Sequence, residues 1–243
     1  MGQKVRPTGF RVGVMIGWKS QWYASKQDFS VLLLEDVKIR KFIQKTLRAR
    51  NQKNQRPGIS RIQIDRTREK VVISISSARV GLIIGKKGAE IDKLTKQLEA
   101  VTKRHIEIKT IEVNRPEVDP QLIAEDIAEQ LEKRASFRRV MKNAMQRAME
   151  NGAKGVRLQL SGRLGGSEMA RCEKSKDGSV PLSTLRTRVE YGFAEASTAQ
   201  GNIGIKVWVN NGDYLTEETT DAANAQTRQV SKKPARQNKR ERQ

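Results

Sequence analysis

The sequence predicts an α+β protein of two compact domains, preceded by an extended basic arm and followed by a polar tail. Three observations support this prediction. Residues 59–113 switch between strand-like and helix-like patterns around a Gly-x-x-Gly segment, residues 120–150 are helical, and residues 156–209 hold runs of alternating apolar residues. A chain of 243 residues is long enough for two such domains and two tails.

The charge balance indicates a polyanion as the partner. Lysine and arginine exceed aspartate and glutamate by 21, and the pI is about 10.4. A surplus of this size is an electrostatic footprint for nucleic acid. No apolar run approaches the roughly 18 residues of a membrane-spanning helix, and the first residues form neither an apolar leader nor a myristoylation signal. We expect a soluble, cytoplasmic protein that binds no membrane.

The sequence offers little for catalysis or metal binding. Cys172 and His105 are the only residues of their kinds, so an internal disulfide is excluded and a zinc site would need several carboxylates. Residues 81–86 resemble a Walker phosphate loop, but its glycine spacing is short and Lys87 stands where magnesium needs a Ser or Thr. We expect no catalytic residue, no metal, no cofactor and no small-molecule substrate.

Residues 1–27 form a basic arm that Pro7 and several glycines interrupt. Its periodicity is too weak to predict a helix. The arm is either docked in extended form on a phosphate-rich surface or disordered, and its aromatic content favours docking because disordered segments are poor in aromatic residues. The candidate anchors are Phe10, Trp18, Trp22 and Tyr23, and the candidate RNA contacts are Lys4, Arg6 and Arg11.

Residues 28–114 form the first domain. A helix from Asp28 to about Arg50 precedes a polar, basic loop over Ala49–Gly58 that ends in a Pro-Gly turn signal. Alternating apolar residues then predict two half-buried strands, a second long helix follows the glycine segment, and a third strand ends near Val113. The apolar positions are Ile39, Phe42, Ile43 and Leu47, then Ile62, Ile64, Val71, Ile73 and Ile75, then Ile91, Leu94, Leu98 and Val101, and finally Ile106 and Ile108.

The segment Gly85-Lys86-Lys87-Gly88 is the candidate RNA clamp of this domain. Its glycines permit close approach of a phosphate, the helix N-terminus behind it favours an anion, and the lysines add charge. An ordinary helix–helix turn has the same composition, but the surrounding strand–strand–helix–helix–strand order is that of a type II KH domain, which clamps four nucleotides with such a loop. No Phe, Tyr or Trp occurs between residues 59 and 113, so we expect the clamp to work without base stacking.

Residues 115–215 form the second domain. Asp119 and Pro120 predict the start of its helical part, and Asn151-Gly152 predicts its end. A change of phase near Ser136-Phe137 indicates two helices or one kinked helix.

This helical part carries a basic set. Arg134, Arg138 and Lys142 are four residues apart, so a continuous helix would place them on one face, where like charges repel. The set is either a ligand-binding stripe or a solvated face, and the residues alone leave both open. Its members are Lys133, Arg134, Arg138, Arg139, Lys142 and Arg147, whereas we expect Glu125, Asp126, Glu129 and Glu132 to be solvated carboxylates with intrahelical partners.

Alternating apolar residues in the last part of this domain predict an antiparallel sheet covered by the two helices. A charged hairpin over residues 168–176, turned at Asp177-Gly178, would add to it, and Arg163 in a glycine-rich turn is a further candidate phosphate contact. Residues 216–243 are too polar to fold alone and form a disordered basic tail. The alternating residues are Val156, Leu158 and Leu160, then Val189, Tyr191 and Phe193, then Ile203, Ile205, Val207 and Val209.

Several blocks, in the same order across residues 1–212, resemble the bacterial-type ribosomal protein S-three family of the small subunit. Two departures are a longer loop over Ala49–Gly58 and Val80 where a Pro is common. The blocks are Gly2–Pro7, Ile84–Gly88, Gln130–Arg134 with Phe137–Arg139, Gly152–Val156, Ser161–Gly166, Val180–Leu182 with Thr184–Arg186, and Gly204–Trp208.

The resemblance implies a protein of the subunit head that binds small-subunit ribosomal RNA and neighbours the tenth and fourteenth small-subunit proteins. It also implies that the protein lines the channel by which messenger RNA enters, and that Arg138, Arg139 and Lys142 contact the message and help to unwind it. Two other classes remain as alternatives: a free KH-type RNA regulator, and a nucleic-acid-cleaving enzyme. The bases contacted do not follow from the sequence.

Overall fold

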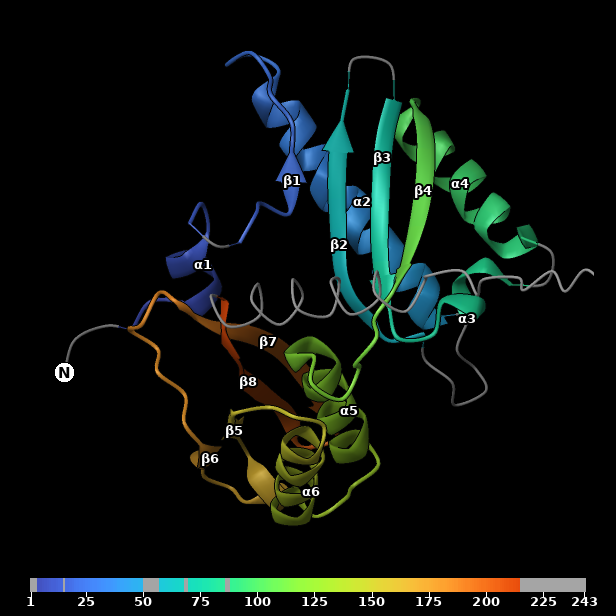
Figure 1. The fold of residues 1–243 in the computed structure, drawn as a ribbon. Coiled ribbons are helices and arrows are strands. Elements are labelled where there is room, and N and C mark those ends of the chain that lie inside the picture. The colour runs from blue at the N-terminus through green and yellow to red at the C-terminus, as the bar shows by residue number, and fades with distance from the viewer. Residues whose placement is uncertain (1–3, 15, 50–56, 68–69, 86–87, 215–243) are drawn as a thin grey trace, which may run out of the picture.

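The computed structural model describes residues 4–14, 16–49, 57–67, 70–85 and 88–214. In this part of the chain, two four-stranded sheets with separate apolar cores confirm the α+β class (Figure 1). The predicted tail and most of the predicted loop after the first helix lie outside the described residues. The elements are α1 (Pro7–Arg11), β1 (Ser20–Gln21), α2 (Phe29–Ala49), β2 (Ile59–Arg66), β3 (Lys70–Ser77), α3 (Val80–Ile84), α4 (Ala89–Thr102), β4 (His105–Glu112), α5 (Pro120–Glu132), α6 (Phe137–Glu150), β5 (Gly155–Gly162), η2 (Leu164–Gly166), β6 (Arg171–Gly178), β7 (Thr187–Thr198) and β8 (Gly201–Asp213).

The first sheet has the order β1-β2-β3-β4, with β2 and β3 antiparallel and β3 and β4 parallel. Ile64 and Ile73 are buried because α2 and α4 pack on the sheet, and the apolar stripes of these helices bring Ile43 and Leu94 into the same core. The predicted strand–strand–helix–helix–strand order is therefore confirmed, with α2 in front of it in the chain.

The arm docks on this chain itself. The prediction that it contains no helix is wrong, since α1 begins at Pro7, whose ring suits the first helical turn. Farther along, β1 pairs in parallel with β2, with Ser20 opposite Ile64. Of the four proposed aromatic anchors only Trp22 is half-buried, whereas the other three are exposed: Phe10, Trp18 and Tyr23.

Two buried charged groups hold the arm. Asp36 of α2 is fully buried and accepts hydrogen bonds from Ser20 Oγ and Trp22 Nε1, both at 2.9 Å, and from Arg66 Nε at 2.8 Å. Arg11 of α1 is also fully buried, and its guanidinium donates to the backbone carbonyls of Thr184, before β7, at 2.8 Å and of Thr187, the first residue of β7, at 2.9 Å. The arm therefore joins the two sheets, with β1 beside β2 and α1 beside β7 (Figure 1).

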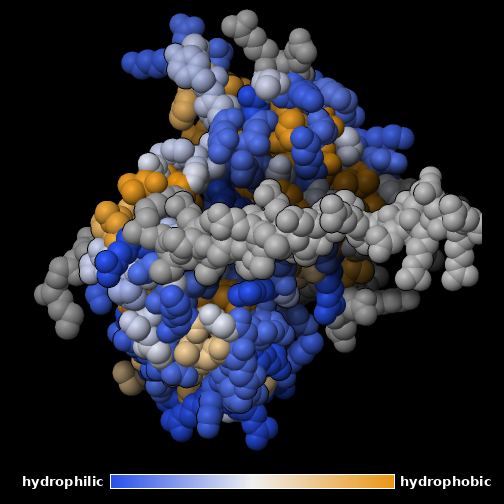
Figure 2. All heavy atoms as spheres, viewed as in Figure 1, coloured by the Kyte–Doolittle hydropathy of each residue, from blue (hydrophilic) through white to orange (hydrophobic). Residues whose placement is uncertain are grey.

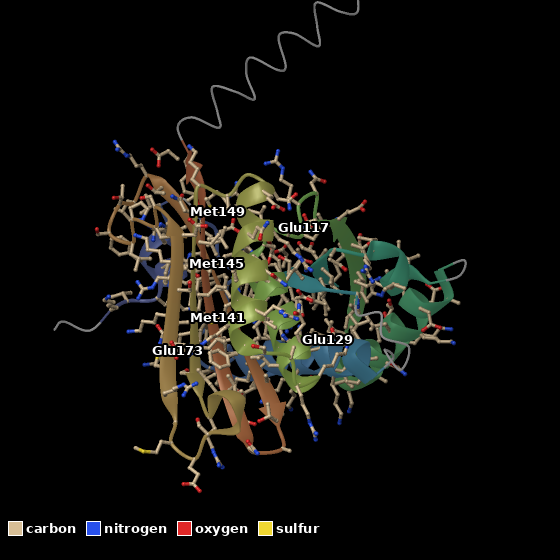
Figure 3. The ribbon with its side chains drawn as sticks, turned by 90° about the horizontal axis from the view of Figure 1, so that it is seen from below. Glu117, Glu129, Met141, Met145, Met149 and Glu173 are labelled. Atoms are coloured by element: carbon tan, nitrogen blue, oxygen red, sulfur yellow. The ribbon has the colours of Figure 1, made fainter. Side chains whose placement is uncertain are left out.

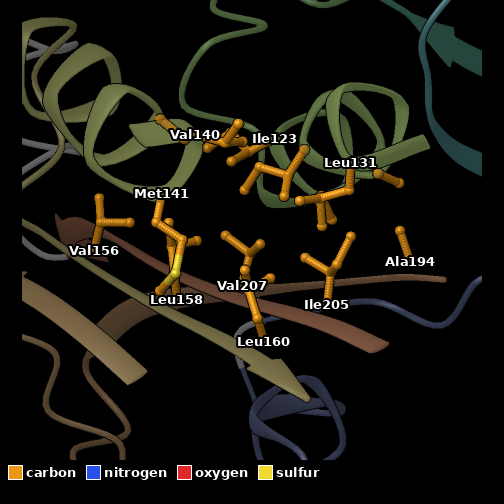
Figure 4. Close-up of a cluster of buried hydrophobic side chains, with 14 of the residues drawn as sticks. Ile123, Leu131, Val140, Met141, Val156, Leu158, Leu160, Ala194, Ile205 and Val207 are labelled. Carbon is orange, nitrogen blue, oxygen red and sulfur yellow. The ribbon is translucent and has the colours of Figure 1, made fainter. Parts of the chain in front are cut away.

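The second sheet has the order β6-β5-β8-β7 and is antiparallel throughout. Two separate helices, α5 and α6, cover one face, and the chain turns between them through Arg134, which has a φ of 61°. Figure 4 shows the resulting core, in which Ile123 and Met141 from the helices meet Leu158 and Val207 from the strands. Asp119 caps α5 as predicted, accepting from Gln121 N and Leu122 N, and Gly152 follows the end of α6 with a φ of 96°.

The predicted charged hairpin is wrong. β6 is a single edge strand that pairs with β5 along its whole length, and Gly178, opposite Gly155, ends it rather than turning it back. The physical reason is the close approach of the chain after β6, because a Cβ on Gly155 would lie 2.2 Å from the carbonyl oxygen of Ser179. From there the chain crosses to β7 at the opposite edge of the sheet.

The alternating residues Tyr191 and Phe193 of β7 do not face the covering helices. The residues of β7 that face α5 are small, beginning with Gly192. A Cβ on Gly192 would lie 2.1 Å from the carbonyl oxygen of Pro120, so the backbone of α5 rests directly on that of β7. Because this contact leaves no room for large side chains, the aromatic residues of β7 occupy the opposite, open face of the sheet.

Candidate nucleic-acid interface

The first candidate surface is the glycine loop between α3 and α4. Gly85 has a φ of 71°, and a Cβ there would lie 2.4 Å from Cγ of Glu90, so glycine is required. Gly88, which precedes α4, has a φ of 80°, and a Cβ there would meet nothing within 4 Å. The first turn of α4 already carries Glu90 and Asp92, which complement the helix dipole. The attraction for a phosphate therefore depends on Lys86 and Lys87, which lie outside the described residues.

The second candidate surface is the exposed side of α6. Val140 and Ala144 turn one side of this helix into the core, and Met141, Met145 and Met149 lie along the side toward β5 and β6 (Figure 3). The spacing of buried residues leaves the remaining side to hydrophilic groups, which gather over α6 in Figure 2. The predicted cations Arg138, Arg139 and Lys142 are all exposed on this helix.

The cations Arg138, Arg139 and Lys142 of α6 differ from Lys133 and Arg147 of the predicted basic set. None of the three is in an ion pair within the described part of the chain, whereas Lys133 pairs with Glu129 at 2.7 Å and Arg147 lies 3.7 Å from Asp126. The Arg138 guanidinium carbon lies 5.6 Å from the centre of the Phe137 ring, which supports it from one side. Arg134 is not on the same helix as Arg138 and Lys142, because α5 ends before it and α6 begins after it.

The remaining predicted RNA contacts differ in how accessible they are. Lys4 and Arg6 are exposed, and Arg163 holds its turn by donating to Ser167 O at 2.8 Å and Gln200 O at 3.1 Å. Arg11 is inaccessible, and burial lowers its pKa from the usual arginine value. The predicted RNA contact of Arg11 is therefore replaced by a structural role.

A further basic cluster lies where the arm meets both sheets. Partial burial lowers the pKa of Lys19 below the ordinary lysine value, and the charges of three guanidinium groups lower it further. These belong to Arg6, Arg61 and Arg40, and Asp119 acts in the opposite direction. Arg61 Nε is buried without a hydrogen-bond partner in the described structure. Sequence patterns do not reveal this cluster, because its members come from three separate elements.

The described residues contain no group of three or more His, Cys, Asp or Glu placed to hold a metal ion. No helix among them is both long and apolar enough to cross a membrane.

Comparison with known proteins supports the assignment of both units. The KH domain family matches residues 38–118, and the family described as ribosomal protein S3, C-terminal domain, matches residues 127–209. The small ribosomal subunit protein uS3 of Rhodopirellula baltica is 55% identical over 240 residues, covering 99% of this chain and all of that protein. The chain belongs to the uS3 family.

Other uS3 proteins agree. That of Desulforamulus reducens is 49% identical over 223 residues, covering 92% of this chain and 98% of that protein, and that of Desulforudis audaxviator is 51% identical over 217 residues, covering 89% and 96%. The resemblance predicted from the motifs is thus confirmed. The KH match contains the glycine loop, and the C-terminal uS3 match contains α6 and all of the second sheet except the last residues of β8.

Proposed function

We propose that this chain is an RNA-binding constituent of the small ribosomal subunit, working in the cytoplasm, and that in the subunit head it lines the channel by which messenger RNA enters. Its relatives are small-subunit proteins, and its own net charge of +21 suits ribosomal RNA. Arg6, Lys4 and the cluster around Lys19 form one proposed rRNA surface, and the glycine loop forms another. The tenth and fourteenth small-subunit proteins are the proposed neighbours.

The observation that carries the messenger RNA assignment is the row of cations on α6 that form no ion pair with any described residue. Arg138 and Lys142 are four residues apart on one helix, and Arg139 adjoins them, so the three charges are held together on a buried, rigid support. Like charges that repel one another without internal partners are stabilised by phosphates. The row therefore suits a single strand passing along α6.

The proposed mechanism is passive. Phosphate contacts along α6 hold strands that have already separated, and translocation elsewhere in the ribosome supplies the work. Each contact releases counterions, so binding weakens by about 0.7 log units per phosphate for each tenfold rise in salt on single strands. No bond is made or broken by this chain in that mechanism.

The test replaces Arg138, Arg139 and Lys142 together by Ala in reconstituted subunits. We expect translation through a stable messenger hairpin to slow, while translation of unstructured message and the sedimentation of the protein with small subunits stay unchanged. The matched control removes three exposed lysines of α2, Lys38, Lys41 and Lys45, and should not produce the hairpin-specific delay. Equal rates for the α6 variant and the wild type on the hairpin message would overturn the channel assignment.

A further inference from the structure

The open face of the second sheet carries a row of alternating cations and aromatic rings. Strand pairing places Lys176 of β6, Arg157 of β5, Trp208 of β8 and Tyr191 of β7 side by side across the sheet. Side chains directly opposite one another in antiparallel strands lie on the same face. Their neighbours in sequence, such as Val156 and Val207, are buried on the other face under α5 and α6. This row therefore faces away from the helices.

Neighbours in this row are in contact. The Tyr191 and Trp208 ring centres are 5.4 Å apart at 58°, and the Arg157 guanidinium carbon lies 5.1 Å from the Trp208 ring centre. Arg6 of the arm completes the row, 4.9 Å from the Tyr191 ring centre. Partial burial raises the pKa of Tyr191, and the Arg6 charge opposes this effect. Both rings remain partly exposed to solvent.

A second row lies beside the first, with Lys174, Gln159, Lys206 and Phe193 on successive strands. Phe193 is 39% exposed on this face. The arm closes the other side of the first row, where Val189 is fully buried beneath it. The open surface is thus a bounded area two rows wide.

The charge of this surface is strongly positive. Arg6, Arg157, Lys174, Lys176 and Lys206 are in no ion pair within the described part of the chain. Of the two glutamates of β7 nearest the rows, Glu195 lies beyond the second row, and Glu190, opposite the buried Val209, lies on the covered face and pairs with Arg188 at 3.0 Å. A basic or purely apolar partner would leave these cations uncompensated.

We propose that this face, the open-sheet platform, binds an unpaired segment of ribosomal RNA by stacking bases on Trp208, Tyr191 and Phe193. Single-strand binding surfaces combine aromatic rings with cations that follow the backbone. A base that stacks on Trp208 displaces the Arg157 guanidinium toward the adjacent phosphate. The lysines of β6 and β8 neutralise further phosphates.

The position of the platform decides which RNA it takes. It lies on the side of the sheet opposite α5 and α6, so the sheet separates it from the cations of α6 (Figure 3). A strand threading past α6 does not reach it, which leaves ribosomal RNA as the occupant. This choice of RNA rests on the proposed function, whereas single-strand binding by the platform does not.

The first experiment measures binding of a fluorescein-labelled ten-nucleotide uridine oligomer to the purified full chain. Trp208→Leu keeps apolar bulk but removes stacking, and we expect affinity to fall by about tenfold or more, whereas Trp208→Phe should keep most of it. Trp18→Leu, which removes an exposed tryptophan of the arm, is the matched control. Circular dichroism checks folding. Unchanged affinity in folded Trp208→Leu protein would overturn the platform.

The second experiment tests the occupant in assembled subunits. Cys172, the only cysteine of the chain, is exposed on β6 opposite Ser161, next to the second row on the same face. An iron chelate attached there before reconstitution generates hydroxyl radicals locally. We expect cleavage of a ribosomal RNA segment, at sites different from those cut from Asn143→Cys on α6 in a Cys172→Ser background. Absence of RNA cleavage from Cys172 would mean that a protein covers the face and would overturn the inference.

These outcomes are separable from those of the α6 variant. A failed hairpin test with normal oligomer binding would remove the channel assignment and leave the platform. Loss of the platform alone would leave the channel assignment intact.

Discussion

The two sheets of this protein pack their helices differently. In the first sheet, large side chains such as Ile64 and Ile73 fill the space beneath α2 and α4. In the second, α5 lies on glycine and alanine of β7, with the backbones in contact at Gly192. The close contact sends the aromatic residues of β7 to the open face. The open face of the second sheet therefore carries rings beside its cations, whereas residues 59–113 of the first unit contain no Phe, Tyr or Trp.

The comparison extends to how each sheet holds the arm. The first uses a buried carboxylate, Asp36, which unites side chains of the arm and of β2. The second uses no carboxylate, because Arg11 is satisfied mainly by backbone carbonyls before β7. The first attachment depends on a buried carboxylate, and the second depends on how the backbone places its carbonyl groups around Arg11.

The largest expected effect comes from Asp36→Ala. It leaves Arg66, whose side chain is 4% exposed, with Glu35 at 2.9 Å as its remaining ion-pair partner, and it frees Trp22 and β1. Removing one member of a buried pair costs about 3 kcal/mol or more. The loss in the free energy of unfolding is measured by urea titration, with circular dichroism and tryptophan fluorescence as the signals. Asp28→Ala, at an exposed residue, is the control. A loss below about 1 kcal/mol would contradict the charge-based attachment.

A smaller effect is expected from Gly192→Ala, which tests the packing of the second sheet. The added methyl meets the Pro120 carbonyl at 2.1 Å, so α5 must shift, and overpacking of this kind costs about 2 kcal/mol. The matched change in the first unit is Gly81→Ala in α3, where a Cβ meets nothing within 4 Å. That change should be neutral or stabilise by about 0.5 kcal/mol. Equal urea midpoints for the two variants would contradict the proposed difference in packing between the two units.

The smallest expected effect distinguishes the two RNA-binding modes by salt. Lys86→Ala with Lys87→Ala should lower the slope of log affinity against log salt by about 1.4, at about 0.7 per phosphate on single strands. Trp208→Leu should weaken binding at every salt concentration without changing the slope, because stacking releases no counterions. Titrations of the same uridine oligomer between low and moderate salt measure both. A slope change with Trp208→Leu would mean that its ring acts by positioning Arg157 rather than by stacking.

Much of the architecture follows from local patterns in the sequence. The alternation around Ile64 and Ile73, the apolar stripe of α2 and the Asp119 cap each depend on residues close together in the chain. The glycine loop is likewise local, since Gly85 and Gly88 need left-handed backbone within one short segment. The exposure of Arg138, Arg139 and Lys142 follows from the period of α6. For these features the sequence by itself is sufficient.

Only the tertiary structure decided which face of the second sheet is covered. Alternation shows that Tyr191 and Phe193 share a face. Which face of the sheet α5 covers depends on its contact with Gly192, which joins segments about 70 residues apart. Arg11 is another example, because an arginine in a basic arm is buried only when distant carbonyls converge on it. The sequence determined the periods and the charges. The packing of remote segments determined which of those residues remain available to RNA.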